Sequence, residues 1–195
     1  MRLLKILEFG HRLLEQAIDP GAIVIDATCG NGHDTKFLAE KVGPSGKVFA
    51  FDIQKQAIAA TTELLRKHQL LERVTLLQKG HEYMKEWIPV KYHGKISAGV
   101  FNLGYLPGGD HSIITRPETT LKALQSLLAM LALHGIVVLV VYPGHPGGEE
   151  EKNAVCEYVS SLDQKKYQVL LYRFINQKNH PPLLIAIEKI KGEKN

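Results

Sequence analysis

The chain has 195 residues, of which 45% are hydrophobic and 23% charged, and we predict one globular domain spanning residues 1–195. No apolar run approaches the roughly 20 residues of a membrane span, and two distant cysteines build neither a disulfide framework nor a zinc site, so we expect a cytoplasmic protein without a membrane partner or a bound metal. The net charge of +4 permits a nucleic-acid partner but does not require one.

Apolar periodicity predicts an alternation of helices and strands along the chain. An amphipathic helix opens it over residues 1–18, and Pro20-Gly21 ends that helix. The expected strands cover residues 22–25, 47–51, 74–77, 96–101, 135–142, 166–174 and 183–187. The expected helices after the first cover residues 34–42, 54–68, a short segment ending near Trp87, 117–133 and 149–162.

Strands that alternate with helices form a parallel sheet with helices on both faces. The last two strands have no helix between them, and residues 175–182 are too few for a parallel crossover, so these strands should pair as an antiparallel hairpin at one edge. The sequence therefore predicts an α/β fold with a seven-stranded, mostly parallel sheet. This describes the Rossmann-like architecture of class I methyltransferases better than a standard dinucleotide-binding fold.

A glycine-containing loop follows the first strand, at the edge where doubly wound sheets bind ligands. Gly30 and Gly32 allow the backbone to approach a ligand, and the next helix presents free N–H groups there. A dinucleotide site would have a third glycine where Thr35 stands, and Asp26 would repel a pyrophosphate. A carboxylate there favours the amino group and sulfonium of S-adenosylmethionine, directly or through water, whereas the alternative is a tight turn without a ligand. The predicted cofactor residues of this loop are Asp26, Thr28, Gly30, Gly32, Asp34 and Thr35.

Polar residues also follow the second and third strands. Asp52 ends the second strand, where a carboxylate can accept hydrogen bonds from both ribose hydroxyls of adenosine, with Gln54 in support or near the adenine. Asp52 could instead cap the next helix. Gly80 and His81 follow the third strand and could contact the base, although His81 could equally start a helix without touching a ligand.

The loop after the fourth strand is predicted to carry the chemistry. Asn102-Leu103-Gly104-Tyr105 resembles the Asn-Pro-Pro-Tyr loop of methyltransferases that act on amino nitrogens, although two residues replace the prolines. A carbonyl there would accept a hydrogen bond from the incoming amine and aim its lone pair at the methyl group, while Tyr105 stacks on a base. Asp110 and His111 are candidates for handling the proton. Alternatively, Asn102 only caps the strand end.

The same rim of the sheet should carry the substrate pocket. Tyr142 and His145 follow the fifth strand, and Leu106 lies in the loop after the fourth. We predict that these three residues line the pocket together with His111. A buried tyrosine and an exposed histidine without a ligand are the alternatives. Residues 176–182 are expected to form an ordinary hairpin loop, with the alternative that they face the substrate.

Five segments of the chain together resemble one small bacterial family. They are Asp-Ala-Thr-x-Gly-Asn-Gly-His-Asp-Thr (26–35), Phe-Asp-Ile-Gln (51–54), Phe-Asn-Leu-Gly-Tyr-Leu-Pro-Gly-Gly-Asp (101–110), Val-Tyr-x-Gly-His-Pro (141–146) and Phe-Ile-Asn-Gln (174–177). The family is that of the tRNA 5-aminomethyl-2-thiouridine methyltransferases, earlier labelled rRNA methylases. The resemblance implies N-methylation of the aminomethyl group on a wobble uridine, with S-adenosylmethionine as the methyl donor. It also implies donor contacts by Asn31, Gly32, Asp52, Gln54 and His81, and acceptor contacts by Asn102 and Tyr105.

The partner that this resemblance implies is the anticodon stem-loop of a tRNA, which the chain would grip without a separate RNA-binding appendage. Residues 55–95 hold eight Lys or Arg and four Asp or Glu, which indicates either a basic surface or ordinary solvated helix faces. The opening helix, or a second subunit of a homodimer, could contribute.

Three other functions are alternatives: an rRNA or small-amine methyltransferase of the same fold, a nucleotide-dependent oxidoreductase, and a non-catalytic RNA-binding module. The missing third glycine and Asp26 argue against the oxidoreductase. The loop at residues 102–110 argues against the non-catalytic module.

Overall fold

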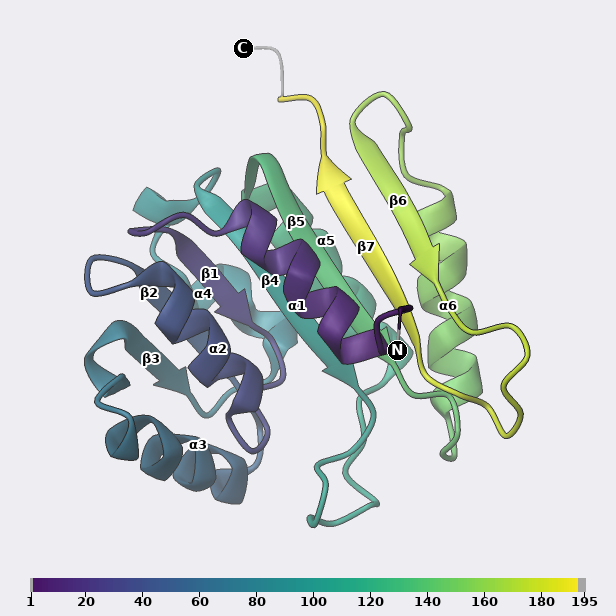
Figure 1. Ribbon diagram of the computed structural model, residues 1–195, viewed down its shortest axis with the longest axis horizontal. Coiled ribbons are helices and arrows are strands. Elements are labelled where there is room, and N and C mark those ends of the chain that lie inside the picture. The colour runs from purple at the N-terminus through teal and green to yellow at the C-terminus, as the bar shows by residue number, and fades with distance from the viewer. Residues whose placement is uncertain (1, 193–195) are drawn as a thin grey trace.

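The computed structural model describes residues 2–192 and contains one seven-stranded sheet with the strand order β3-β2-β1-β4-β5-β7-β6 (Figure 1). The strands are β1 (Ile23–Asp26), β2 (Lys47–Phe51), β3 (Val74–Leu77), β4 (Ile96–Leu103), β5 (Leu131–Val141), β6 (Tyr167–Tyr172) and β7 (Leu183–Lys189). β1 to β5 pair in parallel, and β7 pairs antiparallel with both β5 and β6. The predicted α/β fold with its C-terminal antiparallel hairpin is therefore confirmed. Residues 1 and 193–195 of the predicted domain lie outside the described residues.

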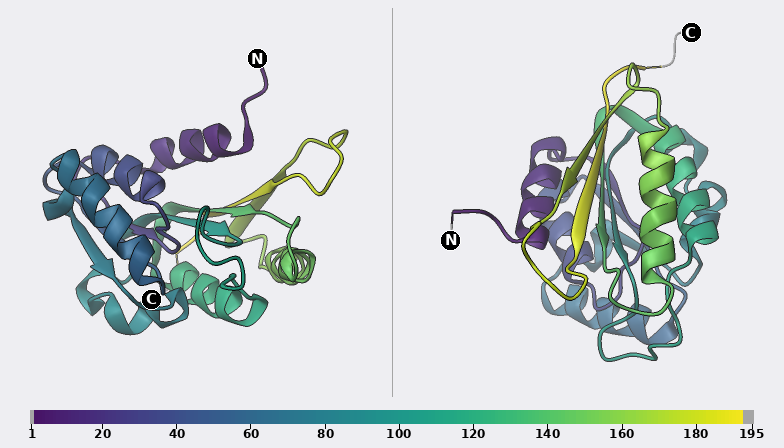
Figure 2. Two further views of the ribbon diagram at one scale, coloured as in Figure 1. Left: turned by 90° about the horizontal axis from the view of Figure 1, so that it is seen from below. Right: turned by 90° about the vertical axis from the view of Figure 1, so that its right-hand side faces the viewer.

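Helices cover both faces of the sheet (Figure 2). They are α1 (Ile6–Ala17), α2 (His33–Val42), α3 (Lys55–Lys67), α4 (Met84–Trp87), α5 (Pro117–Met130) and α6 (Gly148–Ser160), with 3₁₀ turns η1 (Leu71–Arg73), η2 (His81–Tyr83) and η3 (Val90–Tyr92). The first three α-helices bury one apolar cluster against the sheet, and the last three bury another on the opposite face. Within residues 2–192, no helix is long and apolar enough to cross a membrane.

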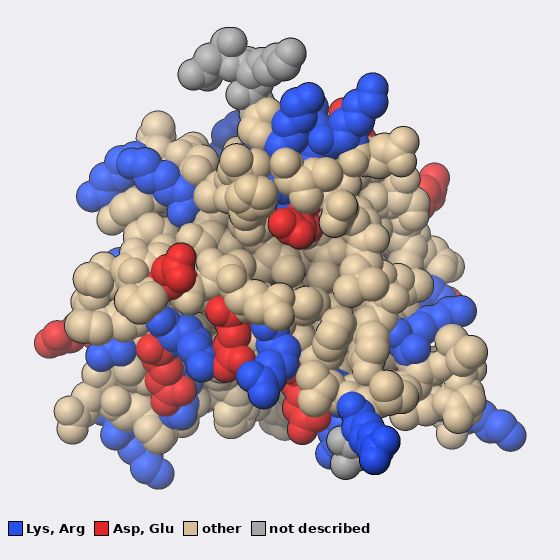
Figure 3. Space-filling view, turned by 45° about the horizontal axis from the view of Figure 1, so that its top comes forward, with Lys and Arg blue, Asp and Glu red and all other residues tan. Residues whose placement is uncertain are grey.

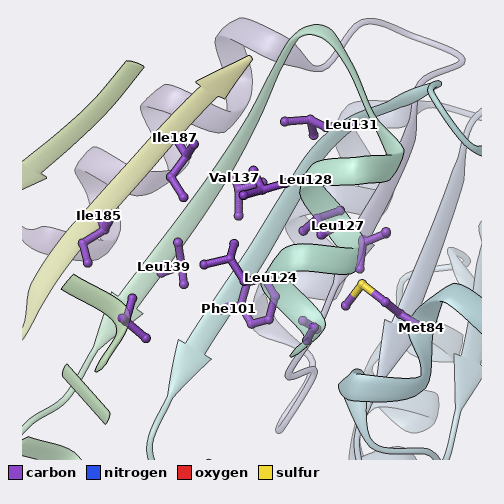
Figure 4. Close-up of a cluster of buried hydrophobic side chains, with 14 of the residues drawn as sticks. Met84, Phe101, Leu124, Leu127, Leu128, Leu131, Val137, Leu139, Ile185 and Ile187 are labelled. Atoms are coloured by element: carbon purple, nitrogen blue, oxygen red, sulfur yellow. The ribbon is translucent and has the colours of Figure 1, made fainter. Parts of the chain in front are cut away.

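The core between α5 and the sheet is closely packed (Figure 4). Leu124 and Leu127 of α5 are fully buried against β4 and β5, and burying each such side chain contributes about 2 kcal/mol. Gly99 in β4 permits this approach, since a Cβ there would lie 2.4 Å from a methyl carbon of Leu127. The close contact fixes β4, and with it the loop that follows β4.

β4 is longer than predicted. It continues to Leu103 instead of ending at Phe101, because Asn102 and Leu103 still pair with β5. Asn102 is thus the second-last residue of a central strand, and the loop after β4 begins only at Gly104. A residue held by strand pairing is positioned more rigidly than a loop residue.

The boundary between α5 and β5 also differs from the prediction. α5 ends at Met130 instead of residue 133, and β5 begins at Leu131 instead of residue 135. His134 has a φ of 62°, and the β4–β5 register shifts beside it, so a bulge interrupts the start of β5. The apolar run at residues 131–133 continued the helical pattern of the sequence, which explains the error.

The strand order reverses at β1, whose neighbours are β2 and β4. The loops that follow the parallel strands extend below the sheet in Figure 1 and meet at this switch point, which is where doubly wound sheets bind ligands. Figure 3 brings forward the end of the molecule that lies opposite these loops, and there Lys and Arg are interspersed with Asp and Glu. That view shows no continuous basic patch of the kind that would mark an RNA-binding face.

Candidate functional site

A cavity of about 680 Å³ lies at the carboxyl ends of β1, β2, β4 and β5. This volume is within the range of about 300–1,000 Å³ that is typical of small-molecule sites. The predicted site residues that line it are Thr28, Gly30, Asn31, Asp34, Asp52, Gln54, Gly80, His81, Asn102, Tyr105, Leu106, Tyr142 and His145. The predicted site residues outside its wall are Asp26, Gly32, Thr35, Asp110 and His111.

Asp52 lies on the cavity wall at the end of β2, and backbone amides hold its carboxylate. The N–H groups of Gly30 and Gln54 donate to its two oxygens at 3.0 and 2.9 Å. Burial raises the pKa of Asp52, although these hydrogen bonds act in the opposite direction. A carboxylate fixed in this way still has lone pairs for two further donors, such as the hydroxyls of a ribose.

The loop after β1 depends on glycine for its shape. Gly30 and Gly32 have φ angles of 50° and 85°. A Cβ on Gly32 would lie 2.9 Å from Cα of Thr61 in α3, and the hydroxyl of Thr61 donates to the carbonyl of Gly30 at 2.9 Å. Gly32 therefore lets the loop pack against α3, behind the cavity wall, and its predicted contact with the donor stays a prediction.

Asp26 is also behind the cavity wall, and its predicted contact with the donor, directly or through water, stays a prediction. Its carboxylate is fully buried and accepts hydrogen bonds from the hydroxyl of Thr35 at 2.6 Å and the N–H of Thr28 at 3.1 Å. Thr35 is fully buried as well, so both residues support the loop from beneath. Burial, followed by the charge of Asp34, raises the pKa of Asp26 to about 7.

The raised pKa of Asp26 predicts a pH dependence of stability. The folded chain keeps a proton on Asp26 up to a pKa of about 7, whereas the unfolded chain releases it near the ordinary pKa of 3.8. The stabilisation is complete below the lower pKa and is lost as the pH rises through the higher one. Asp26→Asn removes this titration. In urea unfolding experiments, the free energy of unfolding of the parent, relative to that of this variant, should decrease as the pH rises from the lower pKa to the higher one. A difference that does not change with pH would show that Asp26 titrates normally.

His81 closes the cavity below the end of β3. Its Nδ1 lies 3.1 Å from the carbonyl oxygen of Ala27, so Nδ1 carries the hydrogen and Nε2 remains an acceptor. Burial lowers the pKa of His81, which keeps the ring neutral. A neutral acceptor next to the backbone of Gly80 suits the edge of an adenine, and the bond to Ala27 also fixes the loop after β1.

Asn102 connects the two halves of the cavity. Its backbone N–H donates to the hydroxyl of Thr28 at 2.7 Å, and its side-chain Nδ2 donates to Oδ2 of Asp34. Across the cavity, Nδ2 of Asn31 donates to the carbonyl of Pro107 at 3.2 Å. These bonds tie the loop after β1 to the end of β4 and to the loop that follows it.

Aromatic side chains stand beside Asn102. The exposed ring of Tyr105 lies 4.2 Å from that of His111 and 5.9 Å from that of His145, measured between centroids. Burial raises the pKa of Tyr142, so its hydroxyl stays protonated. His111 contacts Tyr105 but is not part of the cavity wall, and its predicted contact with the substrate stays a prediction.

Asp110 lies in an exposed turn outside the cavity wall. Its carboxylate accepts a hydrogen bond from the N–H of Ser112 at 2.8 Å, and hydrogen bonds from Ser112 lower its pKa. The carboxylate therefore stabilises the turn. Its predicted role in removing a proton from the substrate finds no support in this arrangement.

A buried carboxyl that the sequence did not reveal holds the loop after β4. Glu151, in the first turn of α6, accepts hydrogen bonds at 2.6 Å from the hydroxyls of Thr115 and Thr120. Thr115 in turn accepts the N–H of Gly104 at 2.9 Å. Burial raises the pKa of Glu151. No sequence pattern links residues so far apart in the chain. Other unpredicted residues of the cavity wall include Leu7, Thr119 and Arg116, and His180 of the loop before β7 also lines the cavity.

Comparison with known proteins shows which family shares this arrangement. A family described as "Putative rRNA methylase" matches residues 48–188. A chloroplastic tRNA (mnm(5)s(2)U34)-methyltransferase from Arabidopsis thaliana is 39% identical over 193 residues, which is 95% of this chain and 70% of that protein.

Two solved structures superpose closely on the whole fold. A "putative rRNA-methylase" from Clostridium thermocellum has a TM-score of 0.93 and 47% identity, and the match covers 97% of this chain and 100% of that one. A "putative methyltransferase" from Streptococcus mutans in complex with SAH has a TM-score of 0.87 and 40% identity, covering 96% of this chain and 99% of that one.

Proposed function

Because the chain belongs to the rRNA methylase family and is an S-adenosylmethionine-dependent methyltransferase, we propose that it methylates a primary amine on a tRNA nucleoside. The proposed acceptor is the aminomethyl group of 5-aminomethyl-2-thiouridine at the wobble position, and the product is 5-methylaminomethyl-2-thiouridine. The similarity to the Arabidopsis enzyme supports this substrate, since the match extends over 95% of the chain.

The orientation of the Asn102 side chain is the observation that carries the proposal. Its Nδ2 is used in the hydrogen bond to Asp34, which leaves the carbonyl Oδ1 as the end available to a substrate. A carbonyl oxygen accepts hydrogen bonds and donates none, so it selects an acceptor that bears an N–H or O–H. An amine that donates one hydrogen to Asn102 keeps its lone pair free for the methyl group.

The other half of the cavity fits the methyl donor. Asp52 can hold the ribose, the turn at Gly30 brings backbone within reach of the ligand, and the neutral His81 can meet the adenine. Asp34 and Asp52 line the cavity, and their charges both raise the pKa of the buried Asp26. A converging set of carboxylates favours a positively charged ligand. When bound, S-adenosylmethionine supplies an electrophilic methyl group on a positively charged sulfur.

The residues of this chain contribute by positioning the reactants. Methyl transfer is an in-line displacement, so holding the amine at the correct angle and distance supplies most of the rate enhancement. The amine must be neutral, because an ammonium has no lone pair. The apolar wall at Leu106 and Tyr142 favours the neutral form, because transfer of a charged amine out of water is costly.

Aromatic and basic side chains beside the cavity form the proposed RNA contact. Lys79, which lines the cavity, lies 4.9 Å from the ring centroid of the exposed Trp87, and Lys122 lies 4.9 Å from that of the exposed Tyr83. Aromatic rings stack on unpaired bases, and lysines contact phosphates. Such a surface fits a single-stranded loop of RNA better than a duplex.

Nucleoside mass spectrometry tests the substrate. Purified protein and S-adenosylmethionine are incubated with total tRNA, and separately with rRNA, from a strain that lacks this protein. We expect 5-aminomethyl-2-thiouridine in the tRNA to be converted to its methylated form, with rRNA unchanged. Methylation of rRNA alone, or an unchanged tRNA profile with active, donor-binding protein, would refute the proposed acceptor.

A further inference from the structure

We propose that His11, on α1, is a positioning residue for methyl transfer that sets the orientation of the Asn102 amide through Asp34. The inference rests on the proposed function, because it assumes that the Asn102 carbonyl receives the acceptor amine. His11 is far from Asp34 and Asn102 in the sequence, and it is not among the residues that line the cavity.

The first link is between His11 and Asp34. Nε2 of His11 lies 2.6 Å from Oδ1 of Asp34, whose side chain is only 13% exposed. A carboxylate only accepts, so Nε2 must carry the hydrogen in this bond. The imidazole also stacks on Phe37 of α2, with 4.0 Å between ring centroids and 7° between ring planes. The ring plane and the tautomer of His11 are thus both fixed.

The second link is between Asp34 and Asn102. Oδ2 of Asp34 accepts the side-chain N–H of Asn102. A flipped amide would place its carbonyl oxygen against the carboxylate, where two acceptors repel each other. Asp34 therefore selects one of the two amide orientations, the one that leaves Oδ1 for the substrate. Without His11, the Asp34 carboxylate can rotate and lose this selection.

The packing of α1 makes the contact possible. Gly10, next to His11, is buried, and a Cβ there would lie 3.0 Å from a methyl carbon of Leu184 in β7 and 3.3 Å from one of Val138 in β5. This close approach of the helix backbone brings His11 over the start of α2. Through this packing the N-terminal helix reaches Asp34, and through Asp34 it reaches Asn102.

A double-mutant cycle separates positioning from general structure. We expect His11→Ala to lower kcat about 10-fold and to leave the Kd of the donor unchanged. A misplacement of about 1 Å can cost about 100-fold, and the loss of His11 should have a smaller effect. His11→Gln should restore most of kcat, since its amide N–H can donate from nearly the same place. Asn102→Ala removes the amide that His11 orients, so His11→Ala should change kcat by less than about twofold in that background. Equal effects of His11→Ala in both backgrounds would overturn the proposal.

A readout without substrate keeps the proposal independent of the assigned RNA. The ¹⁵N–¹H signals of the Asn102 side-chain amide should shift in His11→Ala and return toward the parent position in His11→Gln. Arg12→Ala is the matched control, because Arg12 is exposed on the same helix and pairs with Glu15. Asn102 signals that do not move in His11→Ala would overturn the role of His11. Failure of the parent to methylate any tRNA would overturn the proposed function and leave this result standing.

Discussion

Asp52→Ala is expected to weaken the binding of S-adenosylhomocysteine about 100-fold, since two hydrogen bonds to a charged group are worth about 3 kcal/mol together. The carboxylate of Asp52 lies on the cavity wall and is held by the N–H groups of Gly30 and Gln54. Isothermal titration calorimetry measures the change directly.

Two further variants make this result interpretable. Asp52→Asn keeps one acceptor oxygen and should bind with an affinity between those of the parent and Asp52→Ala. Glu63→Ala removes an exposed carboxylate of α3 that pairs with Arg66, and it should bind like the parent. Parent-like affinity of Asp52→Ala would mean that the ribose binds elsewhere.

Asn102→Ala should lower kcat by about 100-fold while leaving donor affinity within about twofold, because its carbonyl orients the acceptor and the effect of such positioning is of this size. The backbone N–H of Asn102 keeps its bond to Thr28 in this variant, so the loop after β1 is preserved. Single-turnover assays give the rate, and calorimetry gives the affinity.

The matched control is Asn153→Ala, which removes an exposed amide from α6. It should retain parent values of both quantities. If Asn102→Ala reduced donor affinity as much as the rate, Asn102 would belong to the donor half of the cavity and the proposed acceptor contact would be lost.

The sequence predicted those parts of the fold that depend on local patterns. Strand and helix order follows from apolar periodicity, and the short link before residue 183 implied the antiparallel hairpin. Asp52 and Asn102 could be identified as cavity residues because each lies at the carboxyl end of a parallel strand, where ligands of this fold bind.

Contacts between distant segments could not be predicted in the same way. The packing of α1 across the sheet brings His11 to Asp34, which also bonds to Asn102. Glu151 reaches Thr115 because α6 lies beside the loop after β4. Neither arrangement has a sequence motif, since each depends on tertiary packing.

The sequence also could not predict how deeply each side chain is buried. Asp26 is the last residue of β1 and Asp52 directly follows β2, but the carboxylate of Asp26 bonds to Thr35 behind the cavity wall. Asp110 and His111 follow the Asn102–Tyr105 segment closely in the sequence, yet the turn that holds them lies away from the cavity wall. Proximity in sequence to a binding motif did not decide which side chains line the cavity.

A crystal structure of the protein with S-adenosylhomocysteine, a stable form of the spent donor, tests the central claim most directly. The account predicts both ribose hydroxyls within hydrogen-bond distance of Asp52, and the sulfur facing the side of the cavity that holds Asn102. Electron density for the nucleoside at any other place, or no density at saturating ligand concentration, would contradict it.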